Sequence, residues 1–509
     1  PSGHTIQSLI DLHADTIPDH EFVVYPETGS SYTWKQFQKR VQSVADYLSG
    51  KKLSRKLPVA GLLGNGQTAL ELFLGGMYGG FQVLLANPLS GRDILAYVIE
   101  HSETKILFVA EQYQELAEQA LSQISNKPEI VLNHLGNLPA WNDIAPVRNH
   151  LEYIPNPKEK ALLIYTSGTT GRPKGVIHTH ESLLFGGWNT EVAHELKTDD
   201  KSLCVLPLYH INAQVVSVMG TLVNGSGLVM PQRFQASKFW SWMIDHKCTW
   251  FSGVPTILSY LMNTEEEKLI KSKLGIVRFG RSASAALPPA LHKAFEDRFG
   301  IKIVETMGIT ETASPLLSNP IDPKLHKLGS PGIAYGNEVR IANAEGNVAA
   351  LDTESEVQVR GLNLMQGYLK NPEATREAFT TDGWYRTGDL GKMDSDGYVF
   401  VTGRLKELII KGGENISPRE IDDVLYRNKK VMEAAAFPLP DDHYGQIVAA
   451  AIAPRPGENV TESELRKLCL EALGKYRSPT NYFFLKELPK GPSGKIQRLK
   501  LTDQYSNLK

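Results

Sequence analysis

A polar loop follows a short apolar run, and its composition suits the binding of a phosphate group. The segment reads YTSGTTGRPKGVIHTH over residues 165–180. Gly168, Gly171 and Gly175 allow the backbone to turn successive amide N–H groups inward, where they form a concave site for an anion. The hydroxyl groups add donors, and Lys174 adds a mobile positive charge. The spacing departs from GxxxxGK[ST], so we expect a phosphate loop of another kind.

The elements that must position this loop alternate between two patterns. Up to about residue 340, short apolar runs bounded by Gly, Pro or Asn recur, such as VAGLL from position 59 and KIVET from position 302. Between such runs, residues 93–102 and 288–300 show the helical spacing of apolar residues. Alternation of this kind predicts an α/β fold in which mainly parallel sheets are covered by helices.

The texture of the sequence changes twice in its last third. Shorter, turn-rich strand patterns begin near residue 340, and a small α+β pattern follows Arg404, with helices expected at about 417–428 and 461–473. We therefore expect two domains. They are an N-terminal domain of residues 1–403, including a β-rich subdomain at about 335–403, and a C-terminal domain of residues 404–509.

The composition excludes several classes of protein. A chain of 509 residues with 41% hydrophobic and 22% charged residues is globular and too long for one core. The net charge of -2 has no long block of one sign, which argues against nucleic-acid and membrane partners. The three cysteines lie far apart, and no run of 18 apolar residues is present. We expect a cytoplasmic monomer or homodimer.

Six segments occur in a fixed order along nearly the whole chain. They are YTSGTTGRPKG, LPLYHINA, ETMGITETA, GWYRTGD, GRLKELIIKGGENISPREID and LPKGPSGKIQR. This set resembles the signature motifs of the adenylate-forming superfamily, which includes acyl- and aryl-CoA synthetases, firefly-type luciferases and the adenylation domains of peptide synthetases. In the synthetases, a carboxylate attacks the α-phosphate of ATP to give acyl-AMP and pyrophosphate. A thiol then attacks the acyl adenylate and releases AMP. The resemblance implies ATP, Mg²⁺ and coenzyme A.

The same resemblance implies a nucleotide site. Its residues would be Thr166, Ser167, Gly168, Thr169, Thr170, Gly171, Lys174, Met307, Gly308, Asp389 and Arg404. Asp389 would accept hydrogen bonds from both ribose hydroxyls, Glu311 would bind the magnesium ion, and Thr310 would meet the α-phosphate. Many relatives have tyrosine at the position of Met307, and a thioether covers an adenine less tightly than an aromatic ring.

The C-terminal domain would act as a mobile lid. Lys495, in GPSGKIQR, resembles the lysine that neutralises the attacking carboxylate and the α-phosphate during adenylation. Because Lys495 lies far along the chain from the phosphate loop, the lid must close for this step. Lys406 falls at the position of the family's hinge.

The segment KGGENISP, from position 411, would contact the pantetheine arm of coenzyme A in the second step. Its residues at the contact would be Gly412, Gly413 and Glu414. Glycines allow an extended ligand to pass close to the backbone. The same segment also suits a tight turn between a strand and a helix, with Ser417 as the helix N-cap.

The pocket for the acyl group is less strongly marked. Candidate residues are His210, Arg281, Ser282, Ser284 and Trp188. The segment from position 278, RFGRSASAALPP, is similar to the oxalate–CoA ligase branch, and its polar side chains suit a second carboxylate or a small polar acid. A run of small residues equally suits a tunnel for a fatty or aromatic acid, and His210 equally suits a packed core. The expected substrate is a small or medium carboxylic acid.

Other functions remain open. The main alternative is a ligase that loads the phosphopantetheine of an acyl carrier protein instead of free coenzyme A. Both acceptors would use the same tunnel. A nucleotide or acyl sensor would be expected to lack Lys495 or Glu311, and both are present. We find no positive sign of a luciferase-like oxygenase. The favoured function is an ATP-dependent, AMP-forming carboxylate–CoA ligase.

Overall fold

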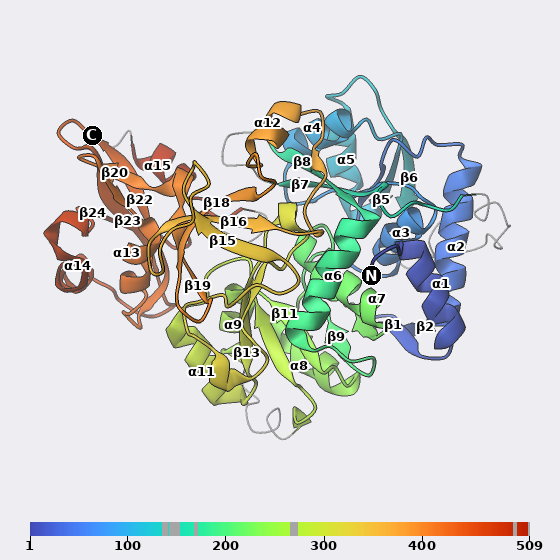
Figure 1. Cartoon of the computed structure of the whole chain (residues 1–509), viewed down its shortest axis with the longest axis horizontal. Helices are drawn as coiled ribbons and strands as arrows, with labels where there is room; N and C mark the ends of the chain where they lie inside the picture. Colours follow the sequence, from blue (N-terminus) through green and yellow to red (C-terminus); the bar gives the residue numbers. More distant parts are fainter. Residues whose placement is uncertain (135–140, 142–152, 167–171, 265–272, 492–495, 507–509) are drawn as a thin grey trace.

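The computed structural model of the chain describes residues 1–134, 141, 153–166, 172–264, 273–491 and 496–506. In Figure 1 the blue to light-orange segments form a large part, and the darker orange to red C-terminal segments form a smaller part beside it. The large part is built on three sheets, and the smaller part on two.

A seven-stranded sheet carries the segment expected to bind phosphate. Its strands, in spatial order, are β17 (Gly367–Tyr368), β8 (Lys174–Thr179), β7 (Lys160–Thr166), β4 (Val83–Leu85), β3 (Val59–Leu62), β5 (Ile106–Ala110) and β6 (Glu129–Asn133). The run from β7 to β6 is parallel, whereas β8 pairs antiparallel with both β7 and β17. The expected phosphate loop therefore joins two antiparallel strands.

An eight-stranded sheet carries the segments expected to bind adenine and the acyl group. Its strands, in spatial order, are β14 (Leu317–Ser318), β13 (Ile303–Met307), β12 (Phe279–Ser282), β11 (Trp250–Gly253), β9 (Lys201–Leu203), β10 (Gly227–Val229), β1 (Glu21–Tyr25) and β2 (Ser30–Thr33). The six strands from β13 to β1 are parallel, and an antiparallel strand closes each edge. Parallel strands buried on both faces read as continuous apolar runs, as the sequence shows.

Helices lie between and around these sheets. They are α1 (Ile6–Thr16), α2 (Trp34–Gly50), α3 (Gln67–Tyr78), α4 (Arg92–Ser102), α5 (Gln114–Leu121), α6 (His180–His194), α7 (Gly220–Asn224), α8 (Ala236–Asp245), α9 (Pro255–Leu261), α11 (Pro289–Phe299) and α12 (Pro372–Glu377). The π-helix η3 (Asn212–Met219) packs on α6 and reaches β11, while α6 also contacts β7 and β8. These two helices thus connect both sheets, and π-helical segments are often found at functional sites.

A four-stranded antiparallel sheet leads to the C-terminal part. Its strands are β15 (Glu338–Ala342), β16 (Ser355–Arg360), β18 (Tyr385–Met393) and β19 (Val399–Arg404). Short 3-10 helices lie around these sheets, namely η1 (Glu111–Tyr113), η4 (Thr310–Thr312), η5 (Pro323–Leu325) and η6 (Leu405–Glu407). The last of them follows β19 directly, so it joins this sheet to the C-terminal elements.

The C-terminal part has a hydrophobic core on each face of its main sheet. Its elements are β20 (Ile409–Lys411), β21 (Glu414–Ile416), α13 (Pro418–Leu425), β22 (Val431–Asp441), β23 (Gly445–Pro454), α14 (Glu462–Arg477), β24 (Asn481–Phe484) and α15 (Arg498–Tyr505). On β22, Ala434 and Ala436 face one core, whereas Ala435 and Phe437 face the other. This is the two-residue alternation of a strand that is covered on both sides.

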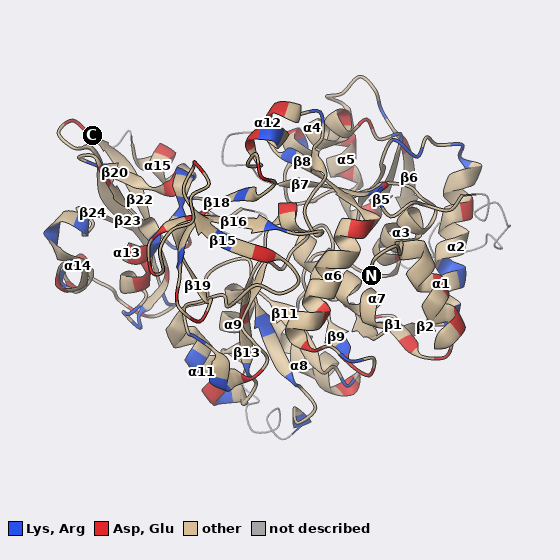
Figure 2. Ribbon diagram, in the orientation of Figure 1, with Lys and Arg blue, Asp and Glu red and all other residues tan. Residues whose placement is uncertain are grey.

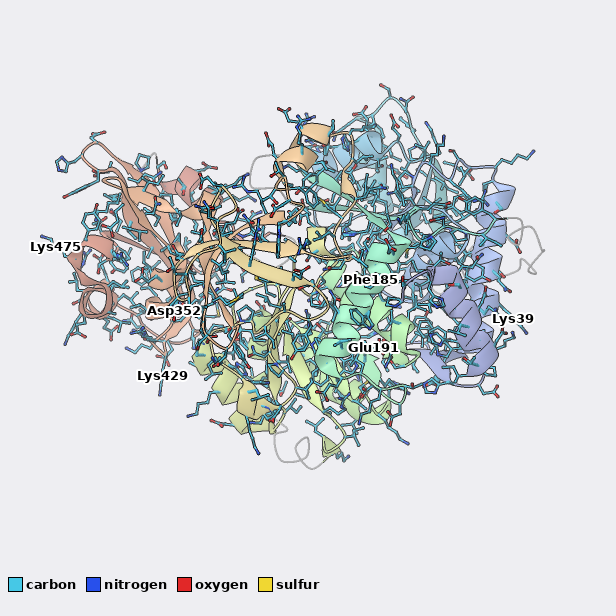
Figure 3. All side chains as sticks on the ribbon, in the orientation of Figure 1. Lys39, Phe185, Glu191, Asp352, Lys429 and Lys475 are labelled. Carbon is cyan, nitrogen blue, oxygen red and sulfur yellow. The ribbon has the colours of Figure 1, made fainter. Side chains whose placement is uncertain are left out.

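The expected fold class is confirmed, and so are the expected helices, which appear as α4, α11, α13 and α14. Positively and negatively charged residues are interspersed along the ribbon of both parts of the molecule (Figure 2). Figure 3 shows Lys429 and Lys475 projecting from the C-terminal part, whereas Phe185 and Glu191 lie on α6 near the centre of the large part. None of the described helices has both the length and the apolar character needed to cross a bilayer.

Candidate active site

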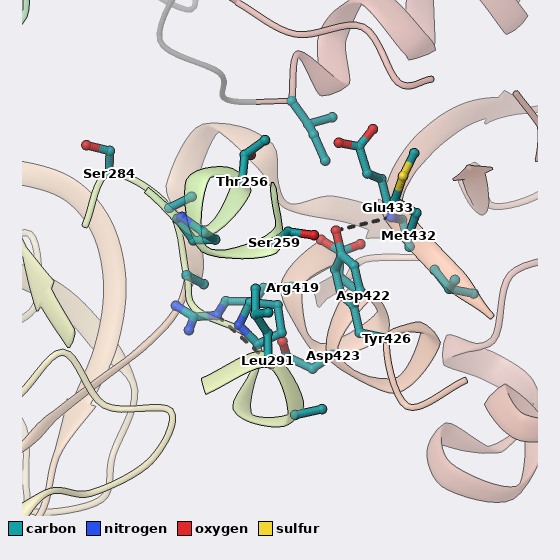
Figure 4. A pocket seen from close by; sticks show the side chains of 18 of the residues that line it. Thr256, Ser259, Ser284, Leu291, Arg419, Asp422, Asp423, Tyr426, Met432 and Glu433 are labelled. Atoms are coloured by element: carbon teal, nitrogen blue, oxygen red, sulfur yellow. Dashed lines mark hydrogen bonds and ion pairs between the residues drawn. The ribbon is translucent and has the colours of Figure 1, made fainter. Parts of the chain in front are cut away.

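A cavity of about 1120 Å³ lies between the large part and the C-terminal part. Met307, Gly308, Asp389 and Arg404 line it, as does Ser284. Asp422 of α13 and Tyr426, the residue that follows this helix, line it from the C-terminal side, facing Ser284 across the opening in Figure 4. The cavity therefore unites the nucleotide and acyl candidates with the expected lid.

The expected ribose-binding pair is preassembled. Asp389 and Arg404 are partners across β18 and β19. The Arg404 Nε donates to Asp389 Oδ1 at 2.6 Å, and its Nη2 donates to Oδ2 at 3.4 Å. The charge of Asp389 raises the pKa of Arg404. Asp389 is only 3% exposed, so the guanidinium fixes the plane of a nearly buried carboxylate.

The strand end that would meet the adenine leaves no room for a side chain beside Met307. Met307 ends β13, and its carbonyl accepts a hydrogen bond from the Leu316 N–H at 2.8 Å. A Cβ on the next residue, Gly308, would lie 2.8 Å from the Ser314 Oγ and 3.0 Å from the Ser314 Cα. Glycine is therefore required here by close approach of the backbone.

Tyr368 stands between the two charged residues expected at the phosphates. The Lys174 Nζ lies 4.7 Å from the centroid of the Tyr368 ring, a cation–π contact. The Tyr368 hydroxyl donates to Glu311 Oε1 at 3.0 Å. Burial, together with the charge of Glu311, raises the pKa of Tyr368, so the hydroxyl stays protonated. Thr166 pairs with Lys174 at the open end of the β7–β8 ladder.

Hydrogen bonds from His178 and Met365 hold the backbone of the segment that carries Thr310 and Glu311. The His178 Nε2 lies 2.7 Å from the Thr310 carbonyl, and its Nδ1 lies 3.0 Å from the Ser182 hydroxyl. Burial lowers the pKa of His178 to about 4, so the ring is neutral and donates to the carbonyl from Nε2. The Met365 N–H donates to the Glu311 carbonyl at 2.8 Å. His178 therefore fixes the position of the backbone at Thr310.

The acyl candidates occupy two depths. Ser284 lines the cavity, whereas Arg281 and Ser282 are 0% exposed within β12. Trp188 lies on α6 against Phe185, with 6.0 Å between the ring centroids, and it is not among the residues that line this cavity. Of the three residues from the segment after position 280, Ser284 is the one that the cavity reaches directly.

His210 lies in a clamped loop. The Asn65 side chain donates to the Leu206 carbonyl at 2.9 Å and accepts from the Leu208 N–H at 2.7 Å. The partly buried His210 ring lies 4.7 Å from the Tyr209 ring, and the His210 N–H donates to the Pro207 carbonyl. His210 does not line the cavity described above.

The expected pantetheine segment forms a hairpin. Gly412 and Gly413 have φ angles of +55° and +85° and connect β20 to β21, as in a two-residue hairpin turn. The expectation of a turn between a strand and a helix is wrong, because β21 intervenes. The Glu414 Oε1 accepts from the Arg477 Nη2 at 3.0 Å. Ser417 stands at the N-cap of α13, but its hydroxyl donates to the Thr402 carbonyl instead of capping the helix.

Two groups of expected residues remain to be placed. The exposed Lys406 lies on η6, between β19 and β20, where the expected hinge would be. Ser167, Gly168, Thr169, Thr170 and Gly171 lie outside the described residues, as does Lys495.

Sequence reasoning missed Tyr368 and Asn212. Tyr368 gives no signal of its own, because its role follows from the pairing of β17 with β8. Asn212 lies within the LPLYHINA motif, but the motif does not indicate which residues Asn212 contacts. Its hydrogen bonds to Arg281 and Ser252 depend on the packing of η3 against β11 and β12.

Fold and site together define an adenylate-forming enzyme with a separate C-terminal domain, and comparison with known proteins agrees. Residues 10–369 match the AMP-binding enzyme family, and residues 420–495 match the AMP-binding enzyme C-terminal domain. The chain belongs to the AMP-binding enzyme family.

Similar proteins cover nearly the whole chain. The chain is 43% identical to the sulfoacetate–CoA ligase of Cupriavidus necator over 98% of its own length and 97% of that protein. It is 35% identical to the oxalate–CoA ligase of Arabidopsis thaliana over 79% of each. The crystal structure of ATP-bound MatB from Rhodopseudomonas palustris superposes with a TM-score of 0.90 at 26% identity, covering 99% of this chain and 100% of that one.

The expected class of enzyme is thereby confirmed. The chain is an ATP-dependent, AMP-forming acid–thiol ligase of the carboxylate–CoA ligase type. ATP, coenzyme A and magnesium belong to this reaction.

Proposed function

We propose that this enzyme joins a small carboxylic acid to coenzyme A in the interdomain cavity, with the residue roles given below. The observation that carries this proposal is the convergence of Met307, Gly308, Asp389, Arg404 and Ser284 on one cavity. These residues come from four separate segments of the sequence, and a common cavity is what a reaction between a nucleotide and an acid requires. A small acid is favoured because the serine at the acyl end is polar and because the relatives named above are sulfoacetate– and oxalate–CoA ligases.

The nucleotide would be oriented by the preassembled pair. The Asp389 carboxylate accepts from the ribose hydroxyls, and Arg404 keeps its plane fixed, so little reorganisation accompanies binding. Met307 covers one face of the adenine at the end of β13. The carboxylate substrate is already anionic and needs no general base. Repulsion between its charge and the phosphate oxygens is the main obstacle to the reaction.

The residues around Glu311 fit a magnesium ion. Glu311 offers a hard carboxylate oxygen, which this ion prefers, and the Tyr368 hydroxyl orients that carboxylate by donating to its Oε1. When bound, the ion neutralises charge on the phosphates. Lys174 supplies a further positive charge at the neighbouring strand end, and Thr310 is held in place through its carbonyl by His178.

The C-terminal domain would deliver Lys495 to the cavity for adenylation and then turn about η6, with Lys406 as the hinge residue. The domain boundary proposed at residues 403 and 404 falls at the end of β19. After the turn, the Gly412–Gly413 hairpin would offer its backbone to the pantetheine arm. Free coenzyme A is the proposed acceptor, in preference to an acyl carrier protein, because the relatives named above are CoA ligases.

Product analysis by mass spectrometry tests this function. The protein is incubated with ATP, Mg²⁺, coenzyme A and a pool of acids that runs from oxalate, malonate and sulfoacetate to aryl and long-chain fatty acids. We expect one dominant acyl-CoA of a small acid, with an equal amount of AMP. Acyl-AMP that accumulates without acyl-CoA would instead identify a carrier protein as the acceptor. Release of phosphate in place of pyrophosphate would contradict the mechanism.

A further inference from the structure

A buried arginine without an acidic partner lies behind the acyl end of the cavity. Arg281 is 0% exposed, and no carboxylate of the described residues forms an ion pair with it. Its Nη1 donates to the Asn212 Oδ1 at 2.9 Å and to the Ser252 Oγ at 3.0 Å. In the described part of the chain its Nε and Nη2 have no hydrogen-bond partner. A buried charge of this kind is costly unless an opposite charge approaches it.

Three arginines that do pair with a carboxylate show what is missing here. The Arg40 Nε contacts Glu71 at 2.8 Å, and the Arg404 Nε contacts Asp389 at 2.6 Å. Arg498 contacts Asp422. In each of these pairs a nearly buried carboxylate balances the cation.

An acidic residue on the adjacent strand does not balance Arg281. In the β12–β13 ladder, Arg281 pairs with Val304, and Ser282 pairs with Glu305. Successive side chains of a strand point to opposite faces, so Glu305 faces away from the guanidinium. The charge of Arg281 thus persists despite a carboxylate on the adjacent strand.

The hydrogen bonds from Arg281 run in one direction, towards the cavity. Arginine is only a donor, so the Asn212 oxygen must face it, and the Asn212 Nδ2 must point the other way. The Nδ2 donates to the Ser284 Oγ at 3.5 Å. The Ser284 oxygen thereby accepts a bond, which leaves its O–H free to donate. The hydrogen bonds from Arg281 through Asn212 to Ser284 therefore leave the Ser284 hydroxyl as a donor towards the cavity. The positive charge of Arg281 lies behind this donor and favours an anion beside Ser284.

Ser284 itself has the features of a ligand-binding residue. It lines the cavity, and Figure 4 shows it opposite the residues of α13. Its φ angle is +70°, a left-handed conformation that is uncommon for serine and is often kept at binding sites. The Thr306 hydroxyl donates to the Ser282 carbonyl at 3.4 Å, so the strand that ends at Met307 lies directly beside this segment. This proximity favours a short substrate chain between the two ends.

We propose that Arg281, Asn212 and Ser284 form a receptor for a second anionic group on the acid. The substrate is then a short dianion, with one carboxylate to be activated and a second carboxylate or a sulfonate held by Ser284. Arg281 is a positioning residue that acts through Asn212. This inference rests on the proposed function, because it concerns the acid that the ligase activates.

The test compares acids that differ only in the second charge. Specificity constants are measured for malonate and sulfoacetate against propionate, with the wild-type protein and with Arg281→Met, Ser284→Ala and Ser259→Ala. Ser259 lines the same cavity but lies outside the hydrogen-bond chain, so Ser259→Ala is the matched control. A second readout is the rise in melting temperature that each acid causes in the absence of ATP.

We expect Arg281→Met to lower kcat/KM for the dianions about 10- to 100-fold, mainly through KM. Propionate should change less than threefold or so, within the range of a lost neutral contact. Ser284→Ala should show a smaller loss of the same kind, and Ser259→Ala none. The dianions should raise the melting temperature of the wild type but not of Arg281→Met. Methionine replaces an unpaired buried charge, so the variant is expected to fold.

Three results would overturn the proposal, and one would separate it from the proposed function. An equal loss with propionate and malonate, a wild-type preference for propionate, or an equal melting shift in Arg281→Met would each contradict the receptor. If no acid yields acyl-CoA but malonate still stabilises only the wild type, the ligase function fails and the receptor stands.

Discussion

The two ends of the cavity treat electric charge differently. At the nucleotide end, Asp389 and Arg404 neutralise each other, and Glu311 accepts a hydrogen bond from the Tyr368 hydroxyl. At the acyl end, Arg281 has only neutral partners, and the Glu305 Oε2 is buried without a hydrogen-bond partner in the described part of the chain. The first arrangement orients groups before the ligand arrives. The second leaves a charge for the ligand to satisfy.

This difference follows from what each end must recognise. The ribose and phosphates of ATP are the same for every enzyme of the family, so rigid, internally paired groups serve there at little reorganisation cost. The acid differs between enzymes. An unpaired buried cation discriminates by charge, because an uncharged chain would leave it unsatisfied. Stability is thus exchanged for specificity at the acyl end.

The largest effect is expected from Lys495→Ala, which removes the charge that would join the two ends during adenylation. Loss of a positioned group of this kind lowers the rate about 100- to 1,000-fold. The reduced step should be adenylation, measured by exchange of pyrophosphate into ATP. Thioester formation from supplied acyl-AMP should be spared, because another face of the proposed lid would serve that step. Lys500→Ala, at an exposed position of α15, is the control. Equal loss in both half-reactions would contradict a mobile lid.

Much of the fold was predictable from the sequence, for a physical reason. Strands buried on both faces appear as apolar runs, and VAGLL and KIVET became β3 and β13 in this way. The order of the strands was not predictable, because it depends on contacts between distant segments. The hairpin of β1 and β2 joins the far edge of the eight-stranded sheet beside β10, and nothing local in residues 21–33 indicates that partner.

The site was predictable where a motif carried it and not where packing did. The pairing of Asp389 with Arg404 agrees with their motifs, and Ser284 lines the cavity as an acyl candidate should. By contrast, the contact of Tyr368 with Glu311 requires two segments to meet that no spacing connects. The isolation of Arg281 from Glu305 depends on which face of its strand each occupies, and a sequence shows the alternation only after the ladder is known.

The stability of the protein should depend on pH through Glu305 at the acyl end. Burial raises the pKa of Glu305 from 4.5 to about 7. Below pH 4.5 the carboxyl is protonated in both states, and between 4.5 and 7 the folded state holds more protons than the unfolded one. The free energy of unfolding therefore falls as the pH rises through this window.

Glu305→Gln has no proton to lose, so it should remove a slope of up to about 1.4 kcal/mol per pH unit. Urea unfolding of both proteins across the window, from pH 4.5 to 7, measures the difference. Parallel curves would show that the Glu305 carboxyl is not isolated from water, and the contrast between the two ends would weaken.

At the nucleotide end, Asp389→Asn should break the preassembled pair. The amide keeps the shape of the side chain but loses the charge that holds Arg404 and that would accept from ribose. A charged hydrogen bond contributes about 1.5–3 kcal/mol, so KM for ATP should rise about 10- to 100-fold with a smaller change in kcat. Asp382→Asn, at an exposed partner of Arg340, is the control. A change in KM for the acid alone, with KM for ATP unaltered, would place Asp389 at the wrong end.

The smallest effect is expected from Tyr368→Phe, and it separates the two contacts of that ring. Phenylalanine keeps the aromatic face beside Lys174 but removes the hydroxyl that donates to Glu311. A hydrogen bond to a charged acceptor contributes about 1.5 kcal/mol at the lower end of its range. The Mg²⁺ concentration for half-maximal adenylation should therefore change about tenfold, and KM for the acid should not change.

Glu311→Gln should raise the Mg²⁺ requirement further than Tyr368→Phe, because it removes the proposed ligand itself instead of the group that orients it. Tyr398→Phe loses a hydroxyl that donates to the Leu325 carbonyl and serves as the control for hydroxyl removal. If Tyr368→Phe altered the preference between malonate and propionate instead, the two ends of the cavity would be electrically coupled. The charged groups at the nucleotide end would then also influence which acid binds at the other end.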